Sequence, residues 1–263
     1  MIQLTRIASD KNNSAKLFII PGGPGLSSLT LRGLDLLKSE FELVYLDFQG
    51  TNESKYVGKK TYDEISSAIS DVIKNESGTK FVLGHSFGGF FAVDAFLNDS
   101  ALGVLCLSTP FLKSTLMSAG KSYSENSTPE LLDTEKNWED KRDNLSFAKW
   151  LSSYGPLYFI NPDGRKILAD DKVSAQFFLD NRGDALLQEA KLANLKSQKG
   201  LKLFVCGSND KLLSLSFLKE DALCGGFDFV EINGASHFVT IDQPEKLSQI
   251  IIEKINFNLK GEI

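Results

Sequence analysis

The chain has 263 residues, of which 42 % are hydrophobic and 24 % are charged, so it is long enough to bury a large core. Its formal net charge of −5 at pH 7 argues against a nucleic-acid partner, because proteins that bind nucleic acids carry a basic excess or stripe. The apolar runs are too short to span a membrane and the first residues lack the apolar core of a signal peptide, so we expect a cytoplasmic protein with no membrane partner.

Short apolar runs alternate with helical patterns along the chain. The predicted strands span residues 2–7, 16–20, 41–48, 80–83, 103–107, 201–206 and 227–232. The first is weakly alternating and is expected to be an antiparallel edge strand. Helices are predicted at 27–38, where Leu29, Leu34 and Leu37 have near-helical spacing, at 61–73 behind a Thr-x-x-Glu capping box, at 87–98 and from about 244. This alternation predicts an α/β fold whose mostly parallel sheet has helices on both faces.

The alternation stops after residue 110. Residues 111–200 are charged, rich in Ser and Asn, and helix-like, so we predict a helical cap inserted into a core domain of residues 1–110 and 201–263. We expect eight of the aromatic side chains in this stretch to pack as helix core. These are Trp138, Phe147, Trp150, Tyr154, Tyr158, Phe159, Phe177 and Phe178.

Three cysteines and two histidines limit the metal and redox chemistry of the chain. Cys106, Cys206 and Cys224 form no Cys-x-x-Cys cluster and are expected to be reduced thiols packed as small apolar side chains. Neither histidine has a partner at the spacing of metal ligands, so we expect no metal and no cofactor.

The most informative motif is Gly-His-Ser-Phe-Gly at residues 84–88, which follows an apolar run and precedes a helical pattern. A Gly-x-Ser-x-Gly sequence in this setting is typical of a nucleophile elbow, a sharp turn between strand and helix that exposes the serine. Glycines on either side leave room for the strained backbone of the turn. Ser86 is therefore the predicted nucleophile.

A serine hydroxyl needs a general base, and the base needs a carboxylate to orient it. His85 is adjacent to Ser86 and would point away from it, which leaves His237, in a loop after the last strand. Asp210 follows the strand and glycine turn at 203–207, and is the predicted acid, although it could instead cap the next segment. Asp228 is the weaker candidate because it lies within a strand.

An acyl transfer enzyme also needs backbone N–H groups that hold the oxyanion of the tetrahedral intermediate. We expect one from Phe87, at the start of the elbow helix, and one from Gly23, in the Pro-Gly-Gly-Pro-Gly turn at residues 21–25. Gly22, Pro24 and Gly25 of the same turn are expected to contact the substrate, since glycines allow a close approach of the backbone.

With these motifs the chain resembles the α/β-hydrolase superfamily over its full length, and within it the proline iminopeptidase group. The His-Gly-Gly-Pro-Gly loop of that group is matched at residues 21–25 except for its first residue, and its Asp-Gln-Arg-Gly segment is partly matched at 47–50. The elbow departs from the group's usual Gly-Gly-Ser-Trp-Gly. The resemblance implies that acidic cap residues hold a free amine, with Glu135, Glu139 and Asp140 as candidates; solvated surface charge is the alternative.

The residues and the resemblance together predict a serine hydrolase that works through an acyl-enzyme. The resemblance implies an aminopeptidase that releases N-terminal residues from small peptides. The alternatives are a carboxylesterase, thioesterase or lactonase acting on a small acyl substrate, and a non-catalytic ligand-binding protein with the same fold. The substrate is expected to be a small molecule or a short peptide, and the sequence indicates no oligomeric state.

Overall fold

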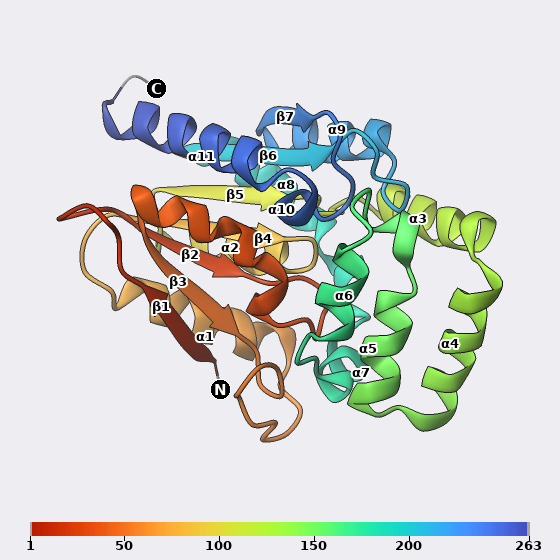
Figure 1. Cartoon of the computed structure of the whole chain (residues 1–263). Coiled ribbons are helices and arrows are strands. Elements are labelled where there is room, and N and C mark those ends of the chain that lie inside the picture. The colour runs from red at the N-terminus through yellow and green to blue at the C-terminus, as the bar shows by residue number, and fades with distance from the viewer. Residues whose placement is uncertain (1, 262–263) are drawn as a thin grey trace.

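A computed structural model describes residues 2–261, and its centre is a seven-stranded sheet (Figure 1). The strands are β1 (Gln3–Ile7), β2 (Lys16–Ile20), β3 (Glu42–Asp47), β4 (Lys80–His85), β5 (Gly103–Leu107), β6 (Leu201–Gly207) and β7 (Asp228–Ile232). Their order is β1-β3-β2-β4-β5-β6-β7, in which β1 pairs antiparallel with β3 and all other pairs are parallel. The predicted α/β fold and its antiparallel edge strand are confirmed.

Helices cover both faces of the sheet, because successive strand residues point to opposite faces and both sets are apolar. In β2, for example, Phe18 and Ile20 belong to one buried cluster and Leu17 and Ile19 to the other. The first cluster contains α1 (Tyr62–Lys74), α2 (Gly88–Leu97), α8 (Leu192–Ser197) and α9 (Leu215–Gly225). The second contains η1 (Ser28–Ser39), α10 (Val239–Asp242) and α11 (Pro244–Leu259).

The predicted helix at 27–38 is a 3-10 helix, η1, which begins after its cap residue Ser27. Its buried residues include Ser28, Leu31, Leu34 and Leu37, one every three residues, which matches three residues per turn. Leu29, assigned to the apolar face from an α-helical period, is only half-buried. The other predicted helices form, and the capping box of Thr61 and Glu64 is present at the start of α1.

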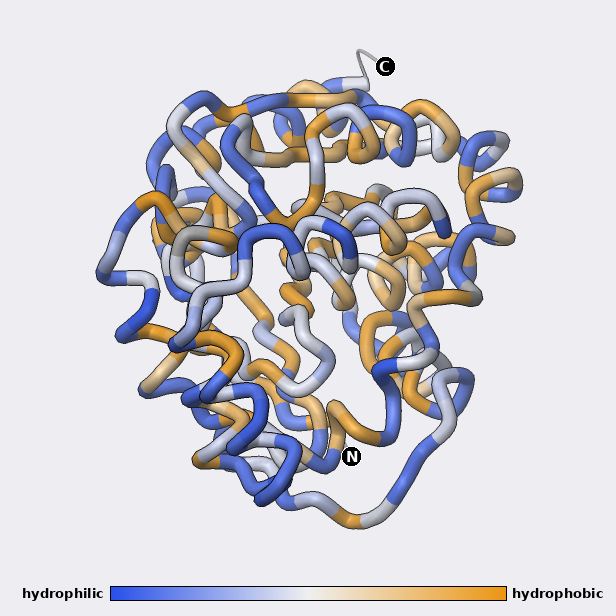
Figure 2. The backbone as a smooth tube through the Cα atoms, turned by 90° about the vertical axis from the view of Figure 1, so that its right-hand side faces the viewer, coloured by the Kyte–Doolittle hydropathy of each residue, from blue (hydrophilic) through white to orange (hydrophobic). Residues whose placement is uncertain are grey.

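The chain between β5 and β6, here called the β5–β6 segment, is helical, and most of it lies beyond the carboxyl ends of the parallel strands (Figure 1), while its last helix, α8, packs on one face of the sheet. It contains α3 (Lys113–Asn126), α4 (Pro129–Lys141), α5 (Asn144–Ser152), η2 (Gly155–Leu157), α6 (Gly164–Ala169), α7 (Ala175–Asn181), η3 (Asp184–Leu187), η4 (Glu189–Lys191) and α8. Figure 2, viewed from this side, shows hydrophilic and hydrophobic stretches interleaved along these helices.

The predicted packing role of the aromatic residues is confirmed for most of them. Trp138, Phe147, Trp150 and Phe159 are buried in a third apolar cluster, which also takes in Leu26 and Phe238 from the loops of the sheet. Tyr154, Tyr158 and Phe178 are partly buried against that cluster, and Phe177 is buried in the first cluster. The third cluster therefore joins the β5–β6 segment to the loops that follow the strands.

The cysteines are free thiols, with Cys106 and Cys206 buried and Cys224 half-buried. Over residues 2–261, no three or more His, Cys, Asp and Glu side chains are grouped in a way that could hold a metal ion. In the same part of the chain, every helix is too short or too polar to cross a membrane.

Candidate active site

Ser86 lies in the turn between β4 and α2 with a φ of +50°, the left-handed region that a non-glycine residue rarely adopts. Its N–H donates to the carbonyl of Leu107 at 2.7 Å, which fixes the turn against the end of β5. A Cβ on Gly84 would collide with the Gly88 carbonyl oxygen, and one on Gly88 would collide with the Pro21 carbonyl oxygen. Only glycine fits these two places, so the geometry is that of a nucleophile elbow.

His237 and Asp210 meet at the same edge of the sheet, after β7 and β6 respectively. The Nδ1 atom of His237 lies 2.8 Å from Oδ2 of Asp210, and both side chains are buried. The other carboxylate oxygen, Oδ1, accepts the backbone N–H groups of Leu212 at 3.0 Å and Leu213 at 2.8 Å. Asp210 therefore caps the following turn and also contacts the imidazole of His237, and its role as the acid of the mechanism stays a prediction.

Asp228, the weaker candidate for the acid, is the first residue of β7 and thus lies at the opposite edge of the sheet from the elbow. Its exposed carboxylate forms an ion pair with Lys254 of α11. It contacts neither histidine.

The turn at residues 21–25 lies against the elbow, since a Cβ on Gly22 would be 3.1 Å from the Cβ of Ser86. Gly23 and Gly25 have φ values of +117° and +95°, which glycine adopts without strain. Within residues 2–261, the N–H groups of Gly23 and Phe87 have no hydrogen-bond acceptor. Two unpaired donors beside a strained serine fit an oxyanion hole, and their catalytic role stays a prediction, as do the substrate contacts of Gly22, Pro24 and Gly25.

The sequence profile described as "Alpha/beta hydrolase family" matches residues 17–250 of the chain. The chain belongs to the alpha/beta hydrolase family. The predicted superfamily is thereby confirmed, and the chain is a hydrolase with this family's fold. No curated protein sequence matches it.

Solved structures of several enzymes have a similar fold. The proline iminopeptidase-related protein of Thermus thermophilus is 21 % identical and has a TM-score of 0.73; the match covers 98 % of this chain and 94 % of that protein's chain. The thermophilic esterase of Thermogutta terrifontis is 15 % identical, with 97 % and 93 % coverage and a TM-score of 0.72. The proline iminopeptidase of Mycobacterium smegmatis is 12 % identical, with 99 % and 96 % coverage and a TM-score of 0.68. At these identities the similarity concerns the fold.

His85 has a structural role in the hydrolase that sequence reasoning missed. Its Nε2 lies 3.1 Å from the backbone carbonyl oxygen of His237, so Nε2 carries the hydrogen and donates it. Nδ1 is then unprotonated, and it has no partner among the described residues. Burial, and next the nearby His237, lower the pKa of His85 to about 3. His85 is therefore a neutral donor that holds the backbone of His237.

Replacing His85 with glutamine should change how the stability of the hydrolase depends on pH. Between pH 6.5 and about 3, the unfolded chain protonates this histidine while the native state keeps it neutral, so wild-type stability falls as the pH falls. The free energy of unfolding falls by at most about 1.4 kcal/mol per pH unit. The variant His85→Gln keeps an N–H donor but does not titrate, so its stability should lack this decrease. Urea unfolding at pH 7 and pH 4.5 measures the difference. If the free energies of unfolding of wild type and His85→Gln differ by the same amount at both pH values, His85 is not the buried neutral donor described here.

Tyr158, in the β5–β6 segment, stacks on the imidazole of His237 with ring centroids 5.1 Å apart and planes 17° apart. Its backbone carbonyl accepts the N–H of Phe238 at 3.2 Å. The carboxylate of Asp242 joins the same two stretches, because it accepts the N–H groups of Asn161 at 2.8 Å and Ser236 at 2.9 Å. No local pattern in the sequence indicates these contacts, since the two stretches lie about 80 residues apart.

A row of tyrosines continues from His237 into the β5–β6 segment. Tyr158 stacks on Tyr154 at a centroid distance of 4.4 Å, and Tyr154 lies 5.3 Å from Tyr123. Burial raises the pKa of Tyr123 to about 12, a hydrogen bond from Trp150 lowers it, and the nearby carboxylates of Glu135 and, more weakly, Glu139 raise it. Glu135 thus faces this aromatic row and is half-buried, whereas Glu139 and Asp140 are exposed. Of the three candidate acids, Glu135 is the one that is both near Tyr123 and partly buried.

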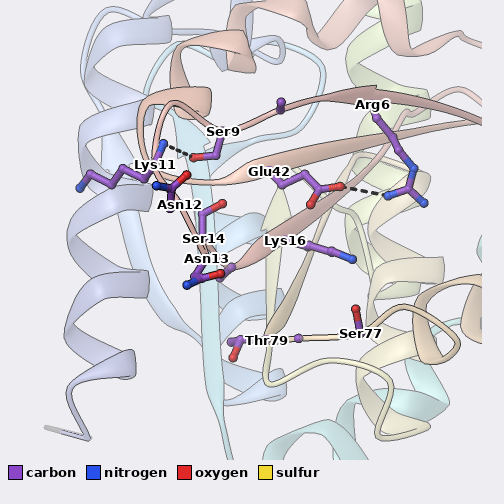
Figure 3. Close-up of a pocket in the computed structure, with 13 residues that line it drawn as sticks. Arg6, Ser9, Lys11, Asn12, Asn13, Ser14, Lys16, Glu42, Ser77 and Thr79 are labelled. Atoms are coloured by element: carbon purple, nitrogen blue, oxygen red, sulfur yellow. Dashed lines mark hydrogen bonds and ion pairs between the residues drawn. The ribbon is translucent and has the colours of Figure 1, made fainter.

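A cavity of about 910 Å³ lies at the other edge of the sheet, where β2 and β4 begin (Figure 3). Its cationic side chains are already paired: Arg6 with Glu42 at 3.1 Å and Lys16 with Glu76 at 2.7 Å. The predicted catalytic residues follow the carboxyl ends of the strands, where ligands bind in open parallel sheets. This cavity therefore belongs to a different part of the hydrolase.

Proposed function

We propose that the chain is a serine hydrolase in which Ser86 is the nucleophile, His237 the general base and Asp210 the residue that orients the base. The observation that carries this proposal is the hydrogen bond of 2.8 Å between His237 and Asp210, at the sheet edge where Ser86 occupies a strained turn. The nucleophile, acid and base also come in the chain order of this family's motif.

In this mechanism the Ser86 Oγ attacks the carbonyl carbon of the substrate while His237 Nε2 takes the hydroxyl proton. The N–H groups of Gly23 and Phe87 hold the oxyanion, and His237 returns its proton to the leaving group. A water molecule then attacks the acyl-enzyme and gives a proton to His237. When the second tetrahedral intermediate breaks down, the acid is released and His237 returns the proton to the Ser86 oxygen.

We propose that residues 111–200 form a cap over the core of residues 1–110 and 201–263, and that the substrate is a small peptide with a free N-terminal amine. Glu135 supports an aminopeptidase, because its carboxylate faces the row of tyrosines that ends on His237. An ammonium group is attracted both by a carboxylate and by aromatic faces. Tyrosine rings also suit the flat, apolar ring of an N-terminal proline.

Glu135→Gln tests this specificity. The variant should raise KM for prolyl β-naphthylamide by about tenfold, the equivalent of about 1.4 kcal/mol, while KM for p-nitrophenyl acetate, which has no amine, stays unchanged. Asp140→Asn is the matched control, since that carboxylate is exposed on the same helix and should leave both constants unchanged. Equal KM values for the naphthylamide in wild type and Glu135→Gln would remove the aminopeptidase assignment.

The second candidate is an esterase for a small acyl substrate. It is favoured by the aromatic and apolar composition of the third cluster and by an esterase among the structures of similar fold. A panel of aminoacyl naphthylamides beside a panel of p-nitrophenyl esters separates the two. Turnover of esters alone would select the esterase.

A further inference from the structure

Asp171 links the β5–β6 segment to the turn that we assign to the oxyanion hole. It lies in the connection between α6 and α7, and its buried carboxylate accepts two hydrogen bonds from Ser27, the cap residue of η1. The backbone N–H of Ser27 donates to Oδ2 at 3.0 Å, and the Ser27 hydroxyl donates to Oδ1. Ser27 follows the turn at residues 21–25 by two positions.

A second contact fixes the same turn from the same connection. The N–H of Ser174 donates to the carbonyl of Gly25 at 2.8 Å, and a Cβ on Gly25 would collide with the Ser174 carbonyl oxygen. Gly22, at the other end of the turn, abuts Ser86. Gly23 therefore lies between one fixed point on the elbow and two fixed points on the β5–β6 segment.

The first turn of η1 is also held from the sheet. Asp47, at the end of β3, accepts the N–H of Ser28 at 2.7 Å and its hydroxyl at 2.9 Å, and Asn52 donates to the same carboxylate at 3.0 Å. Two buried carboxylates thus bind the adjacent residues Ser27 and Ser28, one from each side. Burying two carboxylates near each other is unfavourable unless their hydrogen bonds are made, so Ser27 and Ser28 are held where these bonds form.

We propose that Asp171 is a positioning residue for catalysis: through Ser27 it holds the Gly23 N–H where the oxyanion forms. This inference rests on the proposed function, in which Gly23 donates to the oxyanion. It makes the β5–β6 segment part of the catalytic apparatus, in addition to any role in selecting substrates. Because a displaced oxyanion donor acts on the transition state, loss of Asp171 should lower kcat and leave KM nearly unchanged.

An asparagine at position 171 is a close mimic of the protonated carboxyl group. Burial raises the pKa of Asp171 to about 7, and the charge of Asp47 contributes more weakly in the same direction. The hydrogen bonds from Ser27 and from the Lys172 N–H lower this pKa but do not outweigh burial. In Asp171→Asn, the amide oxygen still accepts the Ser27 N–H, and the amide nitrogen donates to the Ser27 hydroxyl oxygen. Asp171→Asn should therefore keep the turn in place, whereas Asp171→Ala removes both contacts.

The experiment measures the rate and the end point of labelling by a fluorophosphonate probe, together with kcat and KM on p-nitrophenyl acetate, for the full chain. The end point counts active sites, so the rate per labelled site is independent of how much protein folds. Asp171→Ala should lower that rate and kcat by about 10- to 100-fold, and Asp171→Asn should stay within about threefold of wild type. Asp221→Ala is the matched control, because this buried carboxylate holds the Leu112 N–H at the start of α3 and does not contact the turn.

Three results would overturn the proposal. If Asp171→Ala lowers the end point but not the rate per site, Asp171 serves folding only. If Asp171→Ala yields no folded protein, Ser27→Ala decides, since it removes the hydroxyl contact with Asp171 and the cap of the Leu29 N–H but keeps the bond from the Ser27 N–H. A rate per site equal to wild type then refutes the positioning role. If wild type itself is not labelled, the proposed function fails, and this inference fails with it. If wild type is labelled and Asp171→Ala is labelled at the same rate per site, only this inference fails and the proposed function stands.

Discussion

Ser86→Ala is expected to lower kcat on p-nitrophenyl esters by about 10⁴- to 10⁶-fold and to abolish labelling by a fluorophosphonate probe. The methyl side chain has no oxygen to attack the carbonyl carbon, so only the binding site and the oxyanion donors remain. Their contribution sets the residual rate. The fold should persist, because the substitution removes a single oxygen and leaves the backbone hydrogen bond from Ser86 to Leu107 in place.

Ser108→Ala is the matched control for this experiment. Ser108 also has a positive φ, +46°, directly after a parallel strand, and its buried hydroxyl has no partner among the described residues. Its loss should change kcat by less than about threefold, since the hydroxyl is not part of the proposed mechanism. Turnover by Ser86→Ala at more than a few per cent of wild type would reject Ser86 as the nucleophile.

Asp210→Asn is expected to lower kcat by about 10³- to 10⁴-fold with little change in KM. The amide oxygen should take the position that accepts the N–H groups of Leu212 and Leu213, because both of these donors are fixed by the backbone. The amide nitrogen then faces Nδ1 of His237 and donates to it. The imidazole is forced to carry its hydrogen on Nε2, where it cannot accept the proton of Ser86.

Steady-state kinetics with an ester substrate, together with thermal unfolding, check this expectation. The unfolding midpoint should fall only slightly, since the cap of the following turn is kept. Asp228→Asn, an exposed carboxylate in an ion pair with Lys254, should leave kcat unchanged. If Asp210→Asn retains wild-type kcat, or if Asp228→Asn loses it, the acid has been assigned to the wrong residue.

The sheet could be predicted from the sequence because the parallel strands β2 to β6 are largely buried on both faces and are therefore mainly apolar, whereas β7, at the edge, is only partly buried. The strands at 16–20 and 103–107 begin and end at the expected residues, and the others differ at their ends by one or two. The 3-10 helix η1 was assigned the wrong period because Leu29, Leu34 and Leu37 fit an α-helical face, while the structure buries Ser28, Leu31, Leu34 and Leu37. Because the buried residue Ser28 is polar, the apolar residues alone do not show the spacing of three.

The candidate site was predictable only where a motif follows a strand. Ser86 and Asp210 follow apolar strands with glycine turns, and His237 is one of only two histidines in the sequence, so few alternatives had to be weighed. Tyr158 and Asp171 carry no such signal, because each lies in a connection between helices and contacts a residue far away in the sequence, 79 positions for Tyr158 and 144 for Asp171. Their roles depend on how the β5–β6 segment folds back, which no local pattern encodes.

The shared carboxylate of Asp242 has a consequence for protein engineering. Asp242 binds the N–H groups of both Asn161 and Ser236, and Ser174 binds Gly25. Exchanging the stretch from Tyr158 to Ser174 with that of another hydrolase should therefore disturb both the loop of His237 and the turn at residues 21–25. Helices α3 and α4 lie at the periphery of the molecule (Figure 1), and α4 contacts this stretch through the ion pair of Glu130 with Arg165. A chimaera that swaps only residues 113–141 should acquire a new substrate range while its reacting groups keep their geometry.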